Sequence, residues 1–229
     1  MRVLGIVPAR GGSRRVERKN LRVLGGETLV RRTLLTALGA GRLTDLCLSS
    51  EDEEILGQAH GLEAVTVLRR PDELATDTSL AFDMVKHALA AMEADGETYD
   101  AVAIMQCTSP FTQPDDIDGA LELMERSGAE SVVTVGPVEG VHHPLKLKLM
   151  DGDRLTPWLE EDSMKPSHSL PQLWARNGSV YATRRETIAS GVFISENALG
   201  YRMPPERSHD VDTPLDLAFC EFLVERGLA

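Results

Sequence analysis

The chain has 229 residues, and its 36 acidic residues outnumber its 24 lysines and arginines, which gives a net charge of −12. Nucleic acids and anionic membranes both attract proteins with a broad basic face, so we expect neither as a partner. No apolar run approaches the roughly 20 residues that span a bilayer, and the run at residues 3–7 is too short for a signal peptide. The expected location is therefore the cytoplasm.

Short β-rich runs alternate with helical patterns along the chain. The candidate strands are residues 3–7, 46–49, 65–68, 101–105, 131–135 and 179–183. Between them, apolar residues recur at helical spacing over 30–38, 82–92 and 117–124. This alternation predicts repeated βα units and a mainly parallel sheet flanked by helices, which is a Rossmann-like α/β fold.

The alternating pattern breaks between about residues 138 and 176. This stretch holds both tryptophans, a basic apolar run at 145–150 and an Asp-Gly-Asp turn at 151–153. Loops of this length are usually functional or bound to a partner. We predict a hairpin or arm that covers the site or packs on a second subunit.

A last helix is expected after Thr213, which can cap it, and Pro214 suits its first turn. Its apolar residues form one stripe, which we expect to pack against the core. The stripe consists of Leu215, Ala218, Phe219, Phe222 and Leu223.

The three cysteines, Cys47, Cys107 and Cys220, are far apart in the sequence. None belongs to a CxxC pair or lies at a zinc-binding spacing from histidine. Because buried, reduced cysteines are usual in cytosolic proteins, we expect all three to be reduced and in or near the core.

A strongly basic, glycine-containing loop follows the first predicted strand. Glycines let a backbone approach phosphates closely, cations neutralise them, and α/β sheets bind ligands at the carboxyl ends of strands. The loop is neither a Walker A motif nor a GxGxxG fingerprint. The alternative is a basic turn that is merely solvated. Because several cations are concentrated in one short loop of an acidic chain, phosphate binding is favoured. These cations are Arg10, Arg14, Arg15, Arg18 and Lys19.

Two aspartates, Asp210 and Asp212, immediately precede the last predicted helix. Alternate residues of an extended segment point the same way, so both carboxylates would face one spot. Mg²⁺ in proteins typically takes one or two carboxylates together with waters and substrate phosphates. The alternative is a capping role, which Thr213 could fill alone.

Polar side chains also follow the fourth predicted strand. Gln106 can donate and accept hydrogen bonds to a base or a sugar, and Thr108 and Ser109 add hydroxyls. A polar exit from the strand is the alternative interpretation.

Several sequence blocks, spread over nearly the whole chain, occur together in one order. They are Pro8-Ala9-Arg10-Gly11-Gly12-Ser13, Lys19-Asn20, Arg70-Pro71-x-x-Leu74-Ala75-x-Asp77, Gln106-x-Thr108-Ser109-Pro110, His142-His143-Pro144-x-Lys146, Leu170-Pro171-Gln172, Asn177-Gly178-x-x-Tyr181 and Asp210-x-Asp212-Thr213. In this order they resemble the acylneuraminate cytidylyltransferases, also called CMP-sialic acid synthetases.

The resemblance implies a nucleotide-diphospho-sugar transferase-like fold. It implies one cytidylyltransferase domain over residues 1–229, with a dimerisation or lid insertion at about 138–176 and no appended phosphatase-like domain. Members of this family transfer CMP from CTP to the anomeric hydroxyl of a nonulosonic acid and release pyrophosphate with Mg²⁺. We therefore expect CTP and such an acid as substrates, Mg²⁺ as cofactor, and a homodimer.

The resemblance also carries roles to individual residues. The expected catalytic residues are Arg10, Lys19 and Asp210, and the expected Mg²⁺ ligands are Asp210 and Asp212. The nucleotide would be held by Ala9, Arg10, Gly11, Gly12, Ser13, Lys19, Asn20, Arg70 and Asn177. The sugar acid would be held by Gln106, Lys146, Gln172, Tyr181 and Phe193, with Lys146 reaching the site from the partner subunit's arm.

The chain departs from the family pattern at several positions. Arg15 and Glu17 stand where relatives often carry glycine and proline, which bears on CTP binding. Leu80 and Ala81 replace a common pair of serines, so that one nucleotide contact is either lost or supplied by Ser79.

The acid itself stays open: legionaminic, pseudaminic, Kdn and Kdo types are alternatives, as is a non-catalytic nucleotide-binding relative. The blocks around Lys146, Gln172 and Asn177 argue against a Kdo type. The retained Arg10 and Asp212 argue against a non-catalytic relative.

Overall fold

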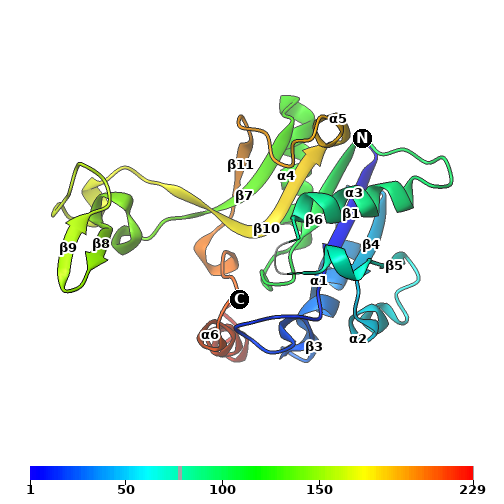
Figure 1. Ribbon diagram of the computed structural model, residues 1–229, viewed down its shortest axis with the longest axis horizontal. Coiled ribbons are helices and arrows are strands. Elements are labelled where there is room, and N and C mark those ends of the chain that lie inside the picture. The colour runs from blue at the N-terminus through cyan, green and yellow to red at the C-terminus, as the bar shows by residue number, and fades with distance from the viewer. Residues whose placement is uncertain (77–78, 229) are drawn as a thin grey trace.

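The computed structural model describes residues 1–76 and 79–228 (Figure 1). Within these residues, seven strands form one sheet in the order β11-β7-β10-β6-β1-β4-β5. The strands are β1 (Val3–Pro8), β4 (Asp45–Ser50), β5 (Val65–Arg69), β6 (Ala101–Met105), β7 (Ser131–Pro137), β10 (Trp174–Arg184) and β11 (Leu199–Arg202). Only β10 runs antiparallel to its neighbours, β6 and β7. The predicted mainly parallel α/β sheet is confirmed.

Helices cover both faces of this sheet (Figure 1). Along β1, Val3 and Val7 are buried against one group of helices, whereas Leu4 and Ile6 are buried against the other. This alternation follows from the two-residue period of a strand. The first group contains α1 (Leu29–Leu38), α2 (Glu53–Leu56), α4 (Pro114–Ser127) and α6 (Pro214–Glu225), and the second contains α3 (Ala81–Met92) and α5 (Arg185–Ala189).

The last helix, α6, begins as predicted but packs differently. The Thr213 hydroxyl accepts a hydrogen bond from the backbone N–H of Asp216, whose side chain reaches back to Thr213, so the helix starts with a capping box. The predicted core stripe is only partly right: Leu223 is buried in the core, but Leu215 is 78% exposed and Phe219 and Phe222 are each 45% exposed. The side of α6 that packs on the core instead carries Leu217, Cys220, Leu223 and Val224, of which Cys220 and Leu223 are buried.

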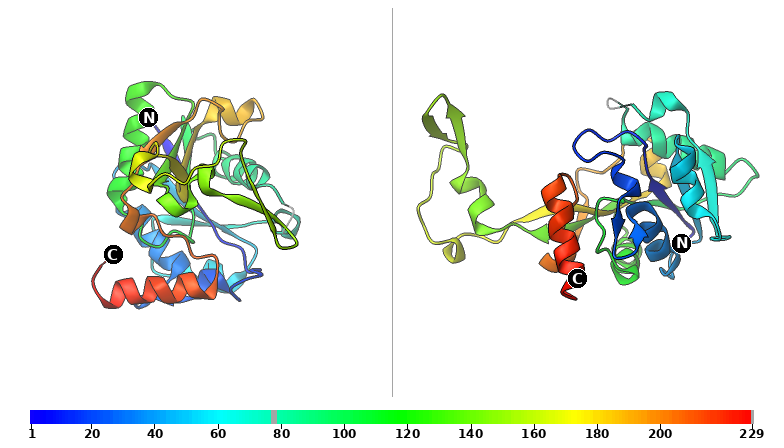
Figure 2. Two further views of the ribbon diagram at one scale, coloured as in Figure 1. Left: turned by 90° about the vertical axis from the view of Figure 1, so that its left-hand side faces the viewer. Right: turned by 90° about the horizontal axis from the view of Figure 1, so that it is seen from below.

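Between β7 and β10 the chain forms an arm, residues 138–173, that projects from the sheet and its helices (Figures 1 and 2). The arm contains an antiparallel hairpin of β8 (Lys148–Asp151) and β9 (Arg154–Pro157), as predicted. Its turn contains Gly152 at a φ of +58°, a left-handed conformation that suits glycine. In these views the arm extends outward and does not fold back over the carboxyl ends of the strands.

Smaller elements complete the fold. A short ladder joins β2 (Val23–Leu24) to β3 (Glu27–Thr28), directly before α1. All three cysteines are buried and unpaired, as expected. Among the described residues, no helix is long and apolar enough to cross a bilayer.

Candidate active site

A cleft of about 350 Å³ opens at the carboxyl ends of β1 and β6. This is the edge of the sheet where α/β proteins bind their ligands, and it is where the sequence placed the site. The cleft is lined by Pro8, Arg10, Gly12, Ser13, Lys19, Asn20, Arg70, Leu74, Ala75, Thr76, Ser79, Leu80, Ala81, Met84, Gln106, Cys107 and Thr108. Ser79 is among these residues, whereas Asp77 of the same sequence region lies outside the described residues.

A second hollow of about 310 Å³ adjoins this cleft and shares Arg10, Ser13 and Lys19 with it. The remaining lining residues are Arg14, Arg15 and Asp212. Among the described residues that line this hollow, four side chains are cationic and Asp212 alone carries a negative charge. Such a hollow has the charge that a polyphosphate requires.

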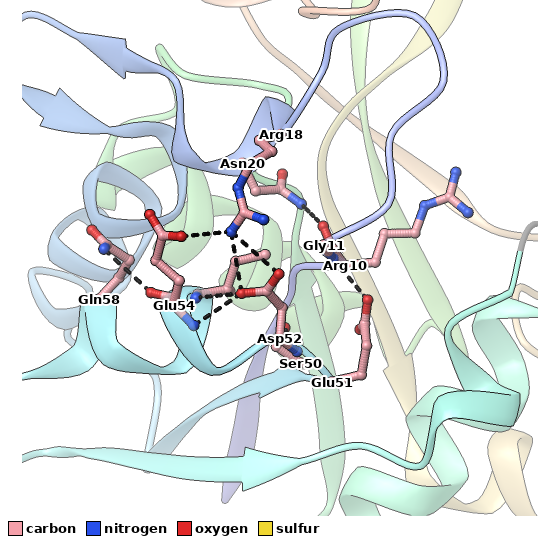
Figure 3. A network of polar contacts seen from close by, with 10 residues as sticks. Arg10, Gly11, Arg18, Asn20, Ser50, Glu51, Asp52, Glu54 and Gln58 are labelled. Atoms are coloured by element: carbon pink, nitrogen blue, oxygen red, sulfur yellow. Dashed lines mark hydrogen bonds and ion pairs between the residues drawn. The ribbon is translucent and has the colours of Figure 1, made fainter.

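The basic loop is anchored from behind by polar contacts (Figure 3). The Asn20 side-chain amide donates to the carbonyl oxygen of Arg10 at 2.9 Å, and the backbone N–H of Gly11 donates to Glu51 Oε1 at 2.7 Å. A Cβ atom on Gly11 would lie 2.5 Å from Asp52 Oδ2, so any other residue there would displace the Asp52 side chain. Asn20 and Gly11 therefore hold the loop in place.

The Arg18 side chain points away from that of Arg10, towards α2 (Figure 3). Its backbone is left-handed, with a φ of +50°, and its Nη2 lies 2.8 Å from Glu54 Oε2 and 3.3 Å from Asp52 Oδ2. The side chain thus fastens the loop to α2 instead of facing the cleft. A left-handed non-glycine residue costs about 1 kcal/mol, which these ion pairs help to offset.

Arg70 is a buried cation in the wall of the cleft. Its Nη2 lies 2.9 Å from Glu51 Oε2 and 3.4 Å from the carbonyl oxygen of Ala9. Glu51 therefore bridges Arg70 and the N–H of Gly11. Arg70 Nε is buried and has no hydrogen-bond partner among the described residues, so Glu51 is the carboxylate that compensates this buried cation.

The two predicted aspartates flank Val211, which is fully buried, while both aspartates are exposed. This alternation confirms that they point to the same side of the segment. Lys19 Nζ lies 3.1 Å from Asp212 Oδ1 and 2.8 Å from the Val211 carbonyl oxygen. On the other oxygen, Arg15 Nη1 lies 3.0 Å from Asp212 Oδ2. The basic loop and the acidic segment thus form one site.

Asp210 and Gln106 both lie close to the backbone at Gly178. Gly178 has a φ of +81°, and a Cβ there would lie 3.4 Å from Gln106 Oε1 and 3.8 Å from Asp210 Oδ1. Although Asp210 is exposed as a residue, neighbouring protein atoms partly desolvate its carboxyl group and raise its pKa; the hydrogen bond with Thr108 opposes this rise, and the nearby Asp212 carboxylate adds to it. A bound cation would stabilise the ionised form of a carboxylate that is desolvated and repelled in this way.

The donor set fits a magnesium ion that is shared with a substrate. Among the described residues, no group of three or more His, Cys, Asp or Glu side chains could hold a metal alone. Mg²⁺ commonly binds through one or two carboxylates and completes its coordination with water and substrate phosphates. Asp210 and Asp212 supply such carboxylates beside the cationic hollow.

The residues predicted for the sugar acid are divided between two regions. The rings of Tyr181 and Phe193 stack at 6.4 Å, next to the core cluster that contains Met84, a residue of the cleft wall. Lys146 and Gln172 instead lie on the arm, where Lys146 Nζ is 3.0 Å from Ser167 Oγ and the Gln172 amide donates to the Leu173 carbonyl oxygen.

Asn177, predicted to contact the nucleotide, is buried and is not among the residues that line the cleft. Its Nδ2 donates to Ser208 Oγ at 3.0 Å and approaches Met203 Sδ at 3.1 Å. Its side chain thus ties β10 to the segment that leads to the aspartates. Its role toward a nucleotide stays a prediction.

Sequence reasoning missed Glu51 and Asp52, which hold the loop. Both directly follow β4, at the same edge of the sheet as the basic loop. That position was a signal that could have identified them.

The sequence of this chain is similar to those of known cytidylyltransferases. Residues 4–188 match a protein family described as Cytidylyltransferase. The CMP-N,N′-diacetyllegionaminic acid synthase of Legionella pneumophila is 33% identical over 229 residues, covering 98% of this chain and 97% of that protein. The pseudaminic acid cytidylyltransferase of Campylobacter jejuni is 25% identical, covering 97% and 96%. The N-acylneuraminate cytidylyltransferase of Streptococcus agalactiae is 28% identical over 93% of this chain, which spans 51% of that longer protein.

The fold is also shared with a solved structure. The CMP:2-keto-3-deoxy-manno-octonic acid synthetase complexed with CTP superposes with a TM-score of 0.71, at 17% identity, over 100% of both chains. This likeness confirms the predicted nucleotide-sugar transferase-like fold.

Proposed function

This chain belongs to the cytidylyltransferase family, and we propose that it transfers CMP from CTP to the anomeric hydroxyl of a sialic-type nonulosonic acid. The observation that carries the proposal is the junction of Lys19 with Asp212, at 3.1 Å. At this contact, the cationic loop meets the pair of carboxylates. The loop would bind a triphosphate and the carboxylates a divalent cation, so together they form one continuous site.

The reaction joins two anions, so the site has to supply positive charge where they meet. The anomeric oxygen forms a bond to the α-phosphorus of CTP, and the bond from that phosphorus to the bridging oxygen breaks, which releases pyrophosphate. Arg10 and Lys19 bind the phosphates and stabilise the charge that develops on them. Asp210, with its raised pKa, accepts the proton of the attacking hydroxyl.

Asp210 and Asp212 are the residues that would hold Mg²⁺. When bound, the ion neutralises charge on the triphosphate and the leaving pyrophosphate. Lys19 keeps Asp212 oriented, and the side chain of Asp216 accepts the Asp212 backbone N–H at 3.1 Å.

The acid substrate is a nonulosonic acid, and N,N′-diacetyllegionaminic acid is the first member to test. The relative named for that acid matches this chain nearly from end to end. Gln106 lines the cleft, and Tyr181 and Phe193 pack against the core cluster of Met84, a residue of the cleft wall. Their amide and ring faces suit an acylated sugar.

The arm supports a homodimer in which each subunit completes the site of the other. The hairpin exposes Met150 and Leu155, which pair across its strands, and an exposed apolar pair is unfavourable without a partner. Lys146 and Gln172 lie on the same arm, so docking of the arm on a second copy would bring them to the partner's sugar pocket. The one domain of residues 1–229 and its cytoplasmic location are part of this proposal.

The test is pyrophosphate release from CTP and Mg²⁺, measured with and without each of a panel of acids. The panel contains N,N′-diacetyllegionaminic, N-acetylneuraminic, pseudaminic and Kdo acids. Release that requires one nonulosonic acid is the expected result. Release with Kdo alone would make this a Kdo-type enzyme. Calorimetric binding of CTP without release for any acid would identify a non-catalytic nucleotide-binding protein.

A further inference from the structure

One ion pair of the basic loop has no role in the reaction described above. Arg15 Nη1 lies 3.0 Å from Asp212 Oδ2, while Lys19 Nζ lies 3.1 Å from Asp212 Oδ1. Both carboxylate oxygens of Asp212 are therefore engaged by cations. In this arrangement a divalent cation has to compete with Arg15 for Oδ2.

The contact between Arg15 and Asp212 is easily broken. The two side chains are 68% and 51% exposed, and exposed ion pairs contribute only a small stabilisation. A phosphate group is a stronger partner, because a guanidinium can bind it through two parallel hydrogen bonds. Arg15 will therefore exchange its carboxylate for a phosphate that comes within reach.

A polyphosphate would come within that reach. Arg15 lines the second hollow together with Arg10 and Lys19, which also line the main cleft. A nucleotide whose phosphates follow Arg10 and Lys19 out of the cleft therefore enters the hollow beside Arg15.

We propose that Arg15 is a positioning residue that exchanges partners when CTP binds. Without nucleotide it neutralises Asp212, and with nucleotide it moves to the polyphosphate and frees Oδ2 for the divalent cation. The inference rests on the proposed function, since it takes CTP as the ligand.

The experiment measures two ligands separately in the full-length protein. Mn²⁺ binding without nucleotide is followed by electron paramagnetic resonance, and CTP binding without divalent cation is followed by calorimetry. Arg15→Ala is expected to bind Mn²⁺ about threefold tighter and CTP about tenfold more weakly than the unmodified protein. These opposite changes cannot both result from a loosened loop.

Matched variants define the controls. Arg42 is an exposed arginine paired with Glu125 at 2.8 Å, so Arg42→Ala removes the same charge elsewhere and is expected to alter neither affinity. Arg15→Lys keeps the charge and should leave Mn²⁺ affinity near that of the unmodified protein. Adding Asp212→Asn to Arg15→Ala should abolish the gain in Mn²⁺ affinity.

The possible failures are distinguishable. An unchanged Mn²⁺ affinity or an unchanged CTP affinity in Arg15→Ala would overturn the exchange of partners. Failure of the unmodified protein to bind CTP at all would instead overturn the proposed function.

Discussion

Glu51 and Arg70 form a buried ion pair behind the basic loop, with Oε2 and Nη2 2.9 Å apart and side chains 17% and 6% exposed. The second oxygen of Glu51 accepts the N–H of Gly11. One carboxylate thus fixes both the loop that would receive phosphates and a cation in the cleft wall. Its removal should affect folding and nucleotide binding together.

We predict that Glu51→Ala lowers the free energy of unfolding by about 3 kcal/mol, because it leaves the Arg70 charge buried without its partner. Urea denaturation measures this change, and calorimetry should show weaker CTP binding. Glu53→Ala is the control, since Glu53 and its partner Arg69 are both exposed and such pairs contribute little. Equal stability of the Glu51 and Glu53 variants would contradict the structural role of Glu51.

A substitution at Gly178 would have two effects, strain in the backbone and crowding of the site. We predict that Gly178→Ala lowers stability by about 1 kcal/mol through its left-handed backbone and lowers kcat/KM at least about tenfold. The second effect arises because the new Cβ would lie 3.0 Å from Ser109 Oγ and 3.4 Å from Gln106 Oε1.

Gly61 provides the comparison for this variant, with a φ of +77° and no atom within 4 Å of the added Cβ. Gly61→Ala should lose similar stability and keep its activity. Equal activity of the two variants would contradict the assignment of Gln106 and Asp210 to the active site.

The hairpin of the arm provides a test of the homodimer. We predict that Met150→Ser together with Leu155→Ser converts dimers to monomers in light scattering, because both side chains belong to one exposed apolar pair. Val67→Ser changes an exposed apolar residue on β5 and should leave the dimer intact. A double variant that stays dimeric would rule out the hairpin as the interface.

Tyr99 predicts how stability changes in alkaline solution. Burial, assisted by its hydrogen bond to Asp45, raises the pKa of Tyr99 from 10.0 to about 12. Folding therefore favours the protonated phenol, so its contribution to stability is complete below pH 10 and is lost as the pH rises towards 12. Melting temperatures of Tyr99→Phe should fall less steeply over this range than those of the unmodified protein. Parallel curves would contradict this assignment.

Local patterns predicted the sheet and most helices because each strand alternates between two buried faces, as Val3 and Leu4 do in β1. The strand β11 was missed because Leu199 and Arg202 are exposed and Gly200 interrupts any apolar pattern. Periodicity showed that α6 has an apolar face, but it could not show that Phe219 would remain partly exposed.

The positions of the basic loop and the aspartates were likewise predictable, because each adjoins a strand end or a helix start. The partners of Arg18 were not, since Asp52 and Glu54 follow it by 34 and 36 residues. No local sequence pattern shows that Arg18 of the basic loop pairs with residues at the start of α2 while Arg15 pairs with Asp212. Long-range charge pairing of this kind requires the folded chain.

The most direct test of CMP transfer follows the phosphorus atoms of CTP. The protein is incubated with Mg²⁺, a nonulosonic acid and CTP labelled at either its α- or its γ-phosphate. The predicted result is that the α-label appears in a new nucleotide that contains the acid, while the γ-label appears only in pyrophosphate. If the α-label remains in CTP or appears only as free CMP with every acid, transfer of CMP to a sugar acid is contradicted.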